Sequence, residues 1–119
     1  MCGIVGYIGS KPALPVLLEG LSKLEYRGYD SAGVAVIQDG TAVVEKSMGR
    51  LADLKAKMNG NIGHGQVGIG HTRWATHGRP SDWNSHPHTD CTGRFVVIHN
   101  GIIESFAQLK EILQQHGHV

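Results

Sequence analysis

The chain has 119 residues, enough for one domain with a modest core, and its formal net charge is only +1. Acidic and basic residues are interspersed, so we expect no nucleic-acid partner and no membrane partner. Two cysteines are too few for a disulfide framework, and no apolar run has the length of a signal peptide core or a transmembrane helix. These features favour a cytoplasmic protein.

The first elements are predicted by apolar patterning. The run from Ile4 to Ile8, stopped by glycine and proline, predicts a buried strand with Cys2 at its first residue. Leucines then recur at helical spacing from Leu14 to Leu24, and Pro12 falls near the first turn, where its missing N–H is harmless. We expect an amphipathic helix there.

A hairpin and a second helix are expected next. Residues 34–37 and 43–44 flank Asp39-Gly40, a strong signal for a tight turn between antiparallel strands. Residues 51–58 predict a short helix closed by Asn59-Gly60, and residues 67–71 predict a glycine-rich strand. The hairpin rules out a purely parallel sheet, so the pattern favours an antiparallel or mixed sheet covered by helices.

The last third of the chain is less regular. No periodicity is found from residue 73 to residue 90. Residues 95–99 predict a buried strand, and apolar residues from Phe106 to Leu113 predict a final helix with Ser105 and Gln108 in a capping box. The chain ends at Val119 without a closing strand, so we expect it to be part of a longer unit.

Cys2 is the leading candidate nucleophile. Removal of Met1 would leave a thiol and a free α-amine on one residue, and an α-amine near neutrality can take the proton of the thiol. The simpler interpretation is that Cys2 only begins a strand. Position alone favours that simpler interpretation, and the other motifs decide against it.

Arg73 and Trp74 directly follow a predicted strand and precede an irregular stretch, a common place for binding residues. The planar fork of an arginine suits a carboxylate. Trp74 fits either an ordinary core position or a lid over a small ligand.

Asn100-Gly101 ends the strand predicted over residues 95–99. The pair is by itself a common turn signal. Alternatively, the asparagine amide and the glycine N–H supply two donors to a tetrahedral intermediate, which makes the pair a candidate oxyanion hole.

A histidine cluster raises the alternative of a metal-binding module. His71, His77, His86, His88 and His99 lie close in sequence, and His86-Pro87-His88 would place two rings on one side of an extended segment. The spacing matches neither paired CxxC nor HExxH motifs, so hydrogen bonding to loop backbone is the simpler role. A Cys-His pair of the thiol protease kind also stays open.

Five ordered motifs resemble the N-terminal glutaminase region of the glucosamine-6-phosphate synthase family, the isomerizing glutamine:fructose-6-phosphate aminotransferases. The similarity covers the whole chain. Related class II amidotransferases share the Cys-Gly-Ile start but lack the Arg-Trp-Ala-Thr-His run. The motifs are residues 2–6, 24–33, 71–78, Asn84 with 86–88, and 99–104.

The resemblance implies an α+β fold, the four-layer α/β/β/α sandwich of the N-terminal nucleophile hydrolases, of which residues 1–119 would be roughly the first half. It implies hydrolysis of the amide of L-glutamine and delivery of ammonia to a sugar isomerase part that converts fructose 6-phosphate to glucosamine 6-phosphate. No cofactor and no metal are expected, and a homo-oligomer is expected at full length. The remaining glutaminase and isomerase parts would be absent from these 119 residues.

Site roles are also implied by the resemblance. Cys2 would be the nucleophile, with its α-amine as base through a water. Arg73 would bind the α-carboxylate of glutamine, Thr76 and His77 would assist, and Trp74 would belong to a closing loop. The oxyanion hole would be formed by Asn100 and Gly101, and the N-terminal residue would be oriented by Arg27 and Gly28. A downstream aspartate that holds the α-amino group in this family would lie beyond residue 119, so we expect little activity from this segment alone.

Overall fold

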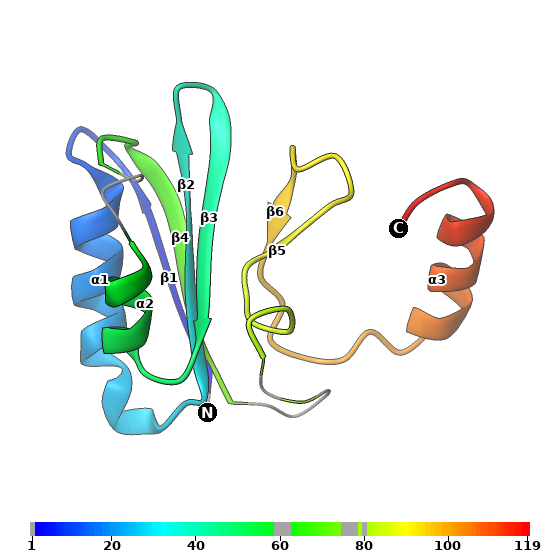
Figure 1. Cartoon of the computed structure of the whole chain (residues 1–119), viewed down its shortest axis with the longest axis horizontal. Coiled ribbons are helices and arrows are strands. Elements are labelled where there is room, and N and C mark those ends of the chain that lie inside the picture. Colours follow the sequence, from blue (N-terminus) through cyan, green and yellow to red (C-terminus); the bar gives the residue numbers. More distant parts are fainter. Residues whose placement is uncertain (1, 59–62, 75–78, 80) are drawn as a thin grey trace.

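The computed structural model describes residues 2–58, 63–74, 79 and 81–119, with the backbone alone at residue 27. It contains a four-stranded sheet, a two-stranded sheet and helices on either side of the pair (Figure 1). The elements are β1 (Gly3–Ile8), α1 (Ala13–Lys23), a 3₁₀ turn (Glu25–Arg27), β2 (Ser31–Gln38), β3 (Thr41–Met48), α2 (Leu51–Lys57), β4 (Val67–Arg73), β5 (His88–Thr89), β6 (Val96–Val97) and α3 (Phe106–Gln115).

The elements form layers in the order helix, sheet, sheet, helix. The larger sheet has the strand order β1-β4-β2-β3, and all of its pairings are antiparallel. Helices α1 and α2 cover one face of this sheet, the β5-β6 pair lies on the other face, and α3 lies beyond that pair (Figure 1). The predicted helix-covered antiparallel sheet is therefore observed.

The β2-β3 hairpin forms at the predicted turn. Asp39 and Gly40 have φ angles of 53° and 76°, the left-handed values that a tight two-residue hairpin needs. Gln38 pairs with Thr41 directly across the turn, and the ladder continues to Ser31 and Met48. The turn thus fixes the register of the whole hairpin.

The core lies between α1 and the larger sheet. Leu17 and Leu21 are fully buried and face β4 at Gly68 and Gly70. A Cβ at Gly68 would lie only 2.8 Å from Leu17, so the absence of a side chain allows the helix to approach the strand closely. Val34 and Val36 of β2, with Leu51 and Leu54 of α2, complete this cluster.

Three local predictions need correction. The strand predicted over residues 95–99 is reduced to β6, because the only strand paired with it, β5, has two residues, and the Asp90 carboxylate accepts the N–H of Phe95 into a turn. The first strand begins at Gly3 rather than at Cys2. Ser105 precedes α3, but its side chain makes no capping hydrogen bond.

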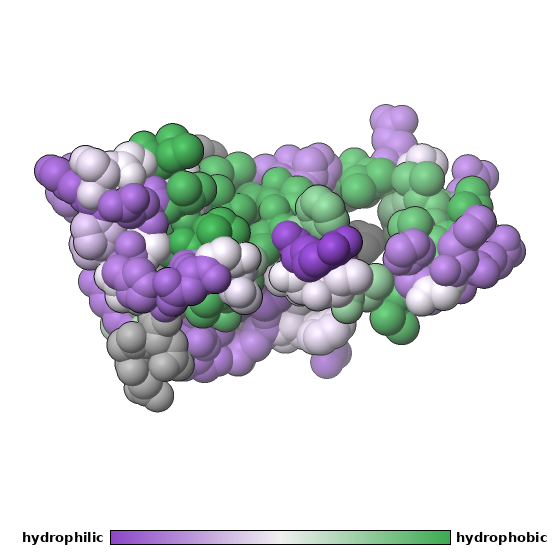
Figure 2. Space-filling view, turned by 90° about the horizontal axis from the view of Figure 1, so that it is seen from above, coloured by the Kyte–Doolittle hydropathy of each residue, from purple (hydrophilic) through white to green (hydrophobic). Residues whose placement is uncertain are grey.

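The face of the larger sheet opposite the helices carries exposed apolar side chains. Ile8, Val67 and Ile37 are cross-strand neighbours on this face, and each is at least 40% exposed. Hydrophobic residues form a continuous surface in the middle of the molecule when it is seen from above (Figure 2). Among the described residues, no helix has the length and apolar character to span a bilayer.

Candidate functional site

Alternation along β4 places two candidate residues on one face of the larger sheet. Gly68 and Gly70 face the helix layer. Because successive residues of a strand face opposite sides of the sheet, Thr72 also faces the helices, whereas His71 and Arg73 face the second sheet. His71 pairs with Ile4 of β1 and Gly33 of β2. The candidate residues at the end of β4 therefore lie on a strand that is hydrogen-bonded on both edges, and this pairing fixes their positions.

Cys2 reaches the same end of the sheet. Gly3 pairs with Thr72, so continuing the register by one residue places Cys2 beside Arg73. The Cys2 Sγ lies 3.4 Å from the backbone N of Trp74, which donates to it, and 3.7 Å from the Trp74 carbonyl oxygen. These two contacts hold the sulfur beside the last residue of β4, next to the candidate arginine.

Arg73 is only 7% exposed at the end of β4. Its backbone carbonyl accepts the N–H of Asp30 at 2.7 Å, which fixes the last residue of the strand against the segment that leads into β2. The guanidinium lies beside the same cavity as the Cys2 thiol. A buried guanidinium at a fixed strand end is suited to bidentate binding of a carboxylate.

Asn100 and Gly101 approach this end of the sheet from the segment after β6. The Asn100 Oδ1 lies 2.5 Å from the Nε2 of His71. Within the described part of the chain, neither the Asn100 amide nitrogen nor the Gly101 backbone N–H has a hydrogen-bond partner. Gly101 has a φ of 155°, a conformation that side chains disfavour. Two adjacent donors are thus available to a ligand.

These groups surround one cavity of about 340 Å³. Its volume is in the range of pockets that bind small molecules. The polar groups converge from the N-terminus, the end of β4 and the segment after β6, while Val97, Ile103 and Phe106 supply apolar wall. The residues that line it are Cys2, His71, Arg73, Trp74, Asn84, His86, His88, Val97, His99, Asn100, Gly101, Ile102, Ile103 and Phe106.

One wall of the cavity packs directly on β2. A Cβ at Gly33 would lie 1.9 Å from the backbone oxygen of His86, so only glycine allows the 86–87 segment to lie against the strand. His86 also accepts the N–H of His99 at 3.5 Å. The glycine therefore sets the distance between the sheet and this wall.

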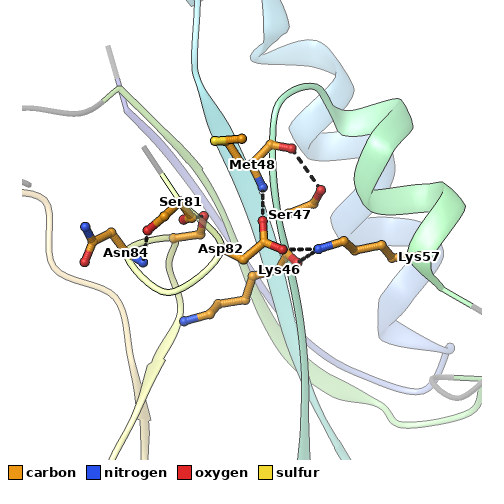
Figure 3. A network of polar contacts seen from close by, with 8 residues as sticks. Lys46, Ser47, Met48, Lys57, Ser81, Asp82 and Asn84 are labelled. Atoms are coloured by element: carbon orange, nitrogen blue, oxygen red, sulfur yellow. Dashed lines mark hydrogen bonds and ion pairs between the residues drawn. The ribbon is translucent and has the colours of Figure 1, made fainter. Parts of the chain in front are cut away.

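The loop before His86 is attached to β3 and α2 (Figure 3). The Asp82 carboxylate accepts the backbone N–H of Met48 at 2.6 Å and pairs with Lys57. The Lys57 ammonium lowers the pKa of the Asp82 carboxyl below its ordinary value, and the Met48 bond acts in the same direction. Lys46 donates to the carbonyl of Trp83 at 3.3 Å. These bonds hold a loop that has no strand ladder of its own.

Three histidine rings contact one another along the cavity wall, with ring planes inclined by 38° and 58°. The ring centroids of His71 and His86 are 4.4 Å apart, and those of His86 and His88 are also 4.4 Å apart. Burial lowers the pKa of His86 to about 3, and nearby His71, His88, Arg73 and Lys46 add to the effect. Burial similarly lowers the pKa of His71 and of His88. All three rings are therefore neutral at pH 7.

These three rings do not form a metal site in the described part of the chain. No group of three or more His, Cys, Asp or Glu residues there is arranged to hold a metal ion. The predicted proximity of His86 and His88 is observed, with the two ring planes inclined by 58° to each other. This geometry does not favour the alternative of a metal-binding module.

The predicted site residues are distributed as follows. The cavity brings together Cys2, Arg73, Trp74, Asn100 and Gly101. The positions of Thr76 and His77 lie outside the described residues, as does the side chain of Arg27. Gly28 has a φ of 76°, and a Cβ there would lie 3.8 Å from the Trp74 ring, close to the segment that contacts Cys2.

Sequence reasoning gave His71 no separate role, and the structure gives it one. Its bond to Asn100 joins positions 29 residues apart. One sequence signal could have indicated it. His71 lies two residues before Arg73 on the same strand, and residues two apart on a strand face the same side of the sheet.

Comparison with known proteins gives matches along the whole chain. The chain is 64% identical over 118 residues to the isomerizing glutamine–fructose-6-phosphate aminotransferase of Symbiobacterium thermophilum, covering 98% of this chain and 19% of that protein. It is 57% identical over 119 residues to the protein of the same name from Pyrococcus horikoshii, covering 100% of this chain and 20% of the relative. The chain thus spans about a fifth of the length of these curated relatives. No family model matches.

Solved structures give the same fold. A glutamine phosphoribosylpyrophosphate amidotransferase from B. subtilis superposes with a TM-score of 0.78 at 24% identity, covering 100% of this chain and 26% of that chain. A second structure, described as the allosteric regulatory enzyme of purine biosynthesis, has a TM-score of 0.78 at 26% identity, covering 100% of this chain and 26% of its own. The α+β fold of the N-terminal nucleophile hydrolases, predicted from the sequence, is confirmed.

Gly33→Ala tests the contact between the sheet and the cavity wall. The new methyl group would overlap the His86 backbone oxygen, so we expect a loss of about 1–3 kcal/mol in the free energy of unfolding. Gly6→Ala is the matched control, because a Cβ at Gly6 meets nothing within 4 Å. Denaturant unfolding of both variants measures the difference. Equal stabilities would contradict the assigned packing.

The neutral His86 predicts a specific loss of stability in acid. The unfolded chain takes up a proton near pH 6.5, whereas the folded chain does so only near pH 3, so stability should fall as pH drops from about 6.5 toward 3. Unfolding measured between pH 4 and 7 should show this slope, and His86→Gln should make it less steep, with the remainder due to His71 and His88, whose pKa values are also lowered.

Asp90→Asn is the control for that slope. Hydrogen bonds from Thr92 and from backbone N–H groups lower the pKa of Asp90 to about 2 from 3.8, so its titration affects stability mainly below pH 4. This substitution should shift the whole curve while leaving the slope between pH 4 and 6.5 unchanged. An unaltered slope in His86→Gln would contradict the assignment to His86.

Proposed function

We propose that this chain, which belongs to the isomerizing glutamine–fructose-6-phosphate aminotransferase family as one segment of its members, carries the nucleophile and oxyanion donors of a glutamine amide hydrolase. The observation that supports the proposal is the cavity shared by Cys2, Arg73, Asn100 and Gly101. It combines a thiol, a guanidinium for a carboxylate and two N–H donors. The thiol and the two donors suit hydrolysis of an amide by a cysteine nucleophile, and the guanidinium suits an amide substrate that carries a carboxylate.

The reaction begins with a thiolate at Cys2. Once Met1 is removed, the α-amine of Cys2 takes the thiol proton, directly or through a water, and the sulfur attacks the side-chain carbonyl carbon of glutamine. The resulting oxyanion accepts hydrogen bonds from the Asn100 amide and the Gly101 N–H. Collapse breaks the C–N bond, and the proton carried by the amine passes to the leaving nitrogen as ammonia. Water then hydrolyses the thioester to glutamate and restores the thiol.

Substrate binding depends on the α-carboxylate of glutamine, at the end of the molecule opposite the side-chain amide. The Arg73 guanidinium binds the α-carboxylate through paired hydrogen bonds, and Trp74 covers the bound molecule beside the Cys2 sulfur. Thr76 and His77 assist this binding, while Arg27 and Gly28 orient the N-terminal residue. These assignments rest on the family motifs that the residues occupy.

The ammonia has a further use in the complete protein. The names of the relatives describe transfer of nitrogen from glutamine to fructose 6-phosphate, and this chain covers about a fifth of their length. We extend that reaction to the natural-length protein that contains these residues, with the sugar phosphate bound outside them. We propose that this natural-length protein is a cytoplasmic homo-oligomer.

Cys2→Ala tests the nucleophile. In the protein at its natural length, the substitution should abolish glutamate release from glutamine while leaving the melting temperature unchanged, since Cys2 contributes no core packing. A variant that retains Met1 should be equally inactive although its thiol is intact, because an amide nitrogen cannot act as base. Ordinary turnover in Cys2→Ala would overturn the assignment, and ordinary turnover with Met1 retained would overturn the role of the amine.

Arg73→Lys and Asn100→Ala separate binding from chemistry. An ammonium cannot reproduce the two parallel bonds of a guanidinium, so Arg73→Lys should mainly raise the KM for glutamine. Asn100→Ala removes a transition-state donor and should lower kcat by ~10²–10³ with little change in KM. Steady-state kinetics on both variants measures the split. The reverse pattern would contradict both roles.

A further inference from the structure

The bond between His71 and Asn100 connects the larger sheet to the candidate oxyanion donors. His71 is fully buried in β4, between Ile4 and Gly33 on the neighbouring strands. Its Nε2 lies 2.5 Å from the Asn100 Oδ1. Asn100 lies in a segment that belongs to no helix or strand, so this bond is its direct attachment to the sheet.

The surroundings of His71 decide where its proton lies. Burial lowers the pKa of its ring, with Arg73 adding to the effect and the Asn100 bond opposing it, so the ring is neutral at pH 7. Its Nδ1 is buried and has no hydrogen-bond partner in the described part of the chain. A proton on Nδ1 would leave a buried donor unsatisfied and would set two acceptors, Nε2 and Oδ1, against each other. The proton therefore lies on Nε2, which donates to Asn100.

The hydrogen bond from Nε2–H of His71 also determines which atom of the Asn100 amide, the oxygen or the nitrogen, lies against the ring. The reversed amide would direct its NH₂ group at Nε2 and would force the proton onto the unsatisfied Nδ1. With Oδ1 held by His71, the NH₂ group is directed elsewhere, and it has no partner among the described residues. Asn100 lines the cavity that also contains Cys2 and Gly101.

We propose that His71 is a positioning residue for the reaction: its Nε2–H holds Oδ1 of Asn100, so that the amide nitrogen is presented to the oxyanion that forms above Cys2. The inference rests on the proposed oxyanion role of Asn100. In this role His71 neither contacts the substrate nor transfers a proton. An oxyanion donor acts only if it is already oriented, because reorientation during the reaction removes its advantage.

The test is a double-mutant cycle in the protein at its natural length. His71→Leu removes the donor while filling buried volume, and His71→Gln replaces the imidazole by an amide that carries an N–H at a similar reach. Thr72→Val is the matched control, since Thr72 is the next residue of β4, is equally buried and faces the helix layer. Each variant is measured for kcat, for the KM of glutamine and for melting temperature, alone and with Asn100→Ala.

We expect His71→Leu to lower kcat at least about tenfold, and no further than the ~10²–10³ of Asn100→Ala, with KM little changed. Adding Asn100→Ala to His71→Leu should give no more loss than Asn100→Ala alone, because both remove the same stabilisation. His71→Gln should restore most of kcat, and Thr72→Val should leave kcat unchanged.

The outcomes separate the two proposals. If Asn100→Ala lowers kcat but His71→Leu leaves it unchanged, or if the two losses multiply in the double variant, the positioning role is wrong and the oxyanion role stands. If Asn100→Ala itself leaves kcat unchanged, the oxyanion role fails and the positioning role fails with it. A lowered melting temperature in His71→Leu with normal kcat would show a structural role alone and would also overturn the inference.

Discussion

The two faces of β4 govern both the stability and the chemistry of this chain. On one face, Gly68 and Gly70 let α1 approach until its leucines touch the strand. On the other face, His71 and Arg73 alternate with these glycines and face the second sheet. The strand is paired on both sides, with β1 and with β2, so its side chains have little freedom to shift. A rigid central strand therefore positions the functional groups that face the cavity.

The second layer holds its shape by contacts other than strand pairing. Its two strands have two residues each, which is too few to define a wall. The 86–87 backbone instead rests on Gly33, and Asp82 attaches the preceding loop to Met48 and Lys57 (Figure 3). These contacts are made by β2, β3 and α2, so the larger sheet and its covering helix determine where the irregular segment can lie. The irregular segment can thus carry binding residues without a strand ladder of its own.

The sequence predicts the elements that depend on local pattern. Leucine spacing predicts α1, and Asp39-Gly40 predicts the hairpin, because helix periodicity and left-handed turn residues act over a few positions. The length of β6 depends on its partner and could not be read locally. Motif resemblance identified Cys2, Arg73 and Asn100 as candidates, but the role of His71 arises from a contact across 29 residues. Strand alternation places His71 on the same face as Arg73, but local pattern does not show that its ring meets that asparagine.

Burial of the histidines also shapes the electrostatics of the cavity. If His71, His86 and His88 were charged, the cavity that Arg73 lines would contain three further cations, which would compete with the guanidinium for an anionic group. Desolvation and mutual repulsion lower their pKa values, so they remain neutral and act as hydrogen-bonding surfaces. Arg73 then supplies the fixed positive charge at the end of β4, beside the thiol of Cys2. If Arg73 binds a substrate carboxylate as proposed, this single fixed charge defines where the carboxylate lies. The distance from Arg73 to the Cys2 sulfur then selects the length of substrate whose amide reaches the thiol.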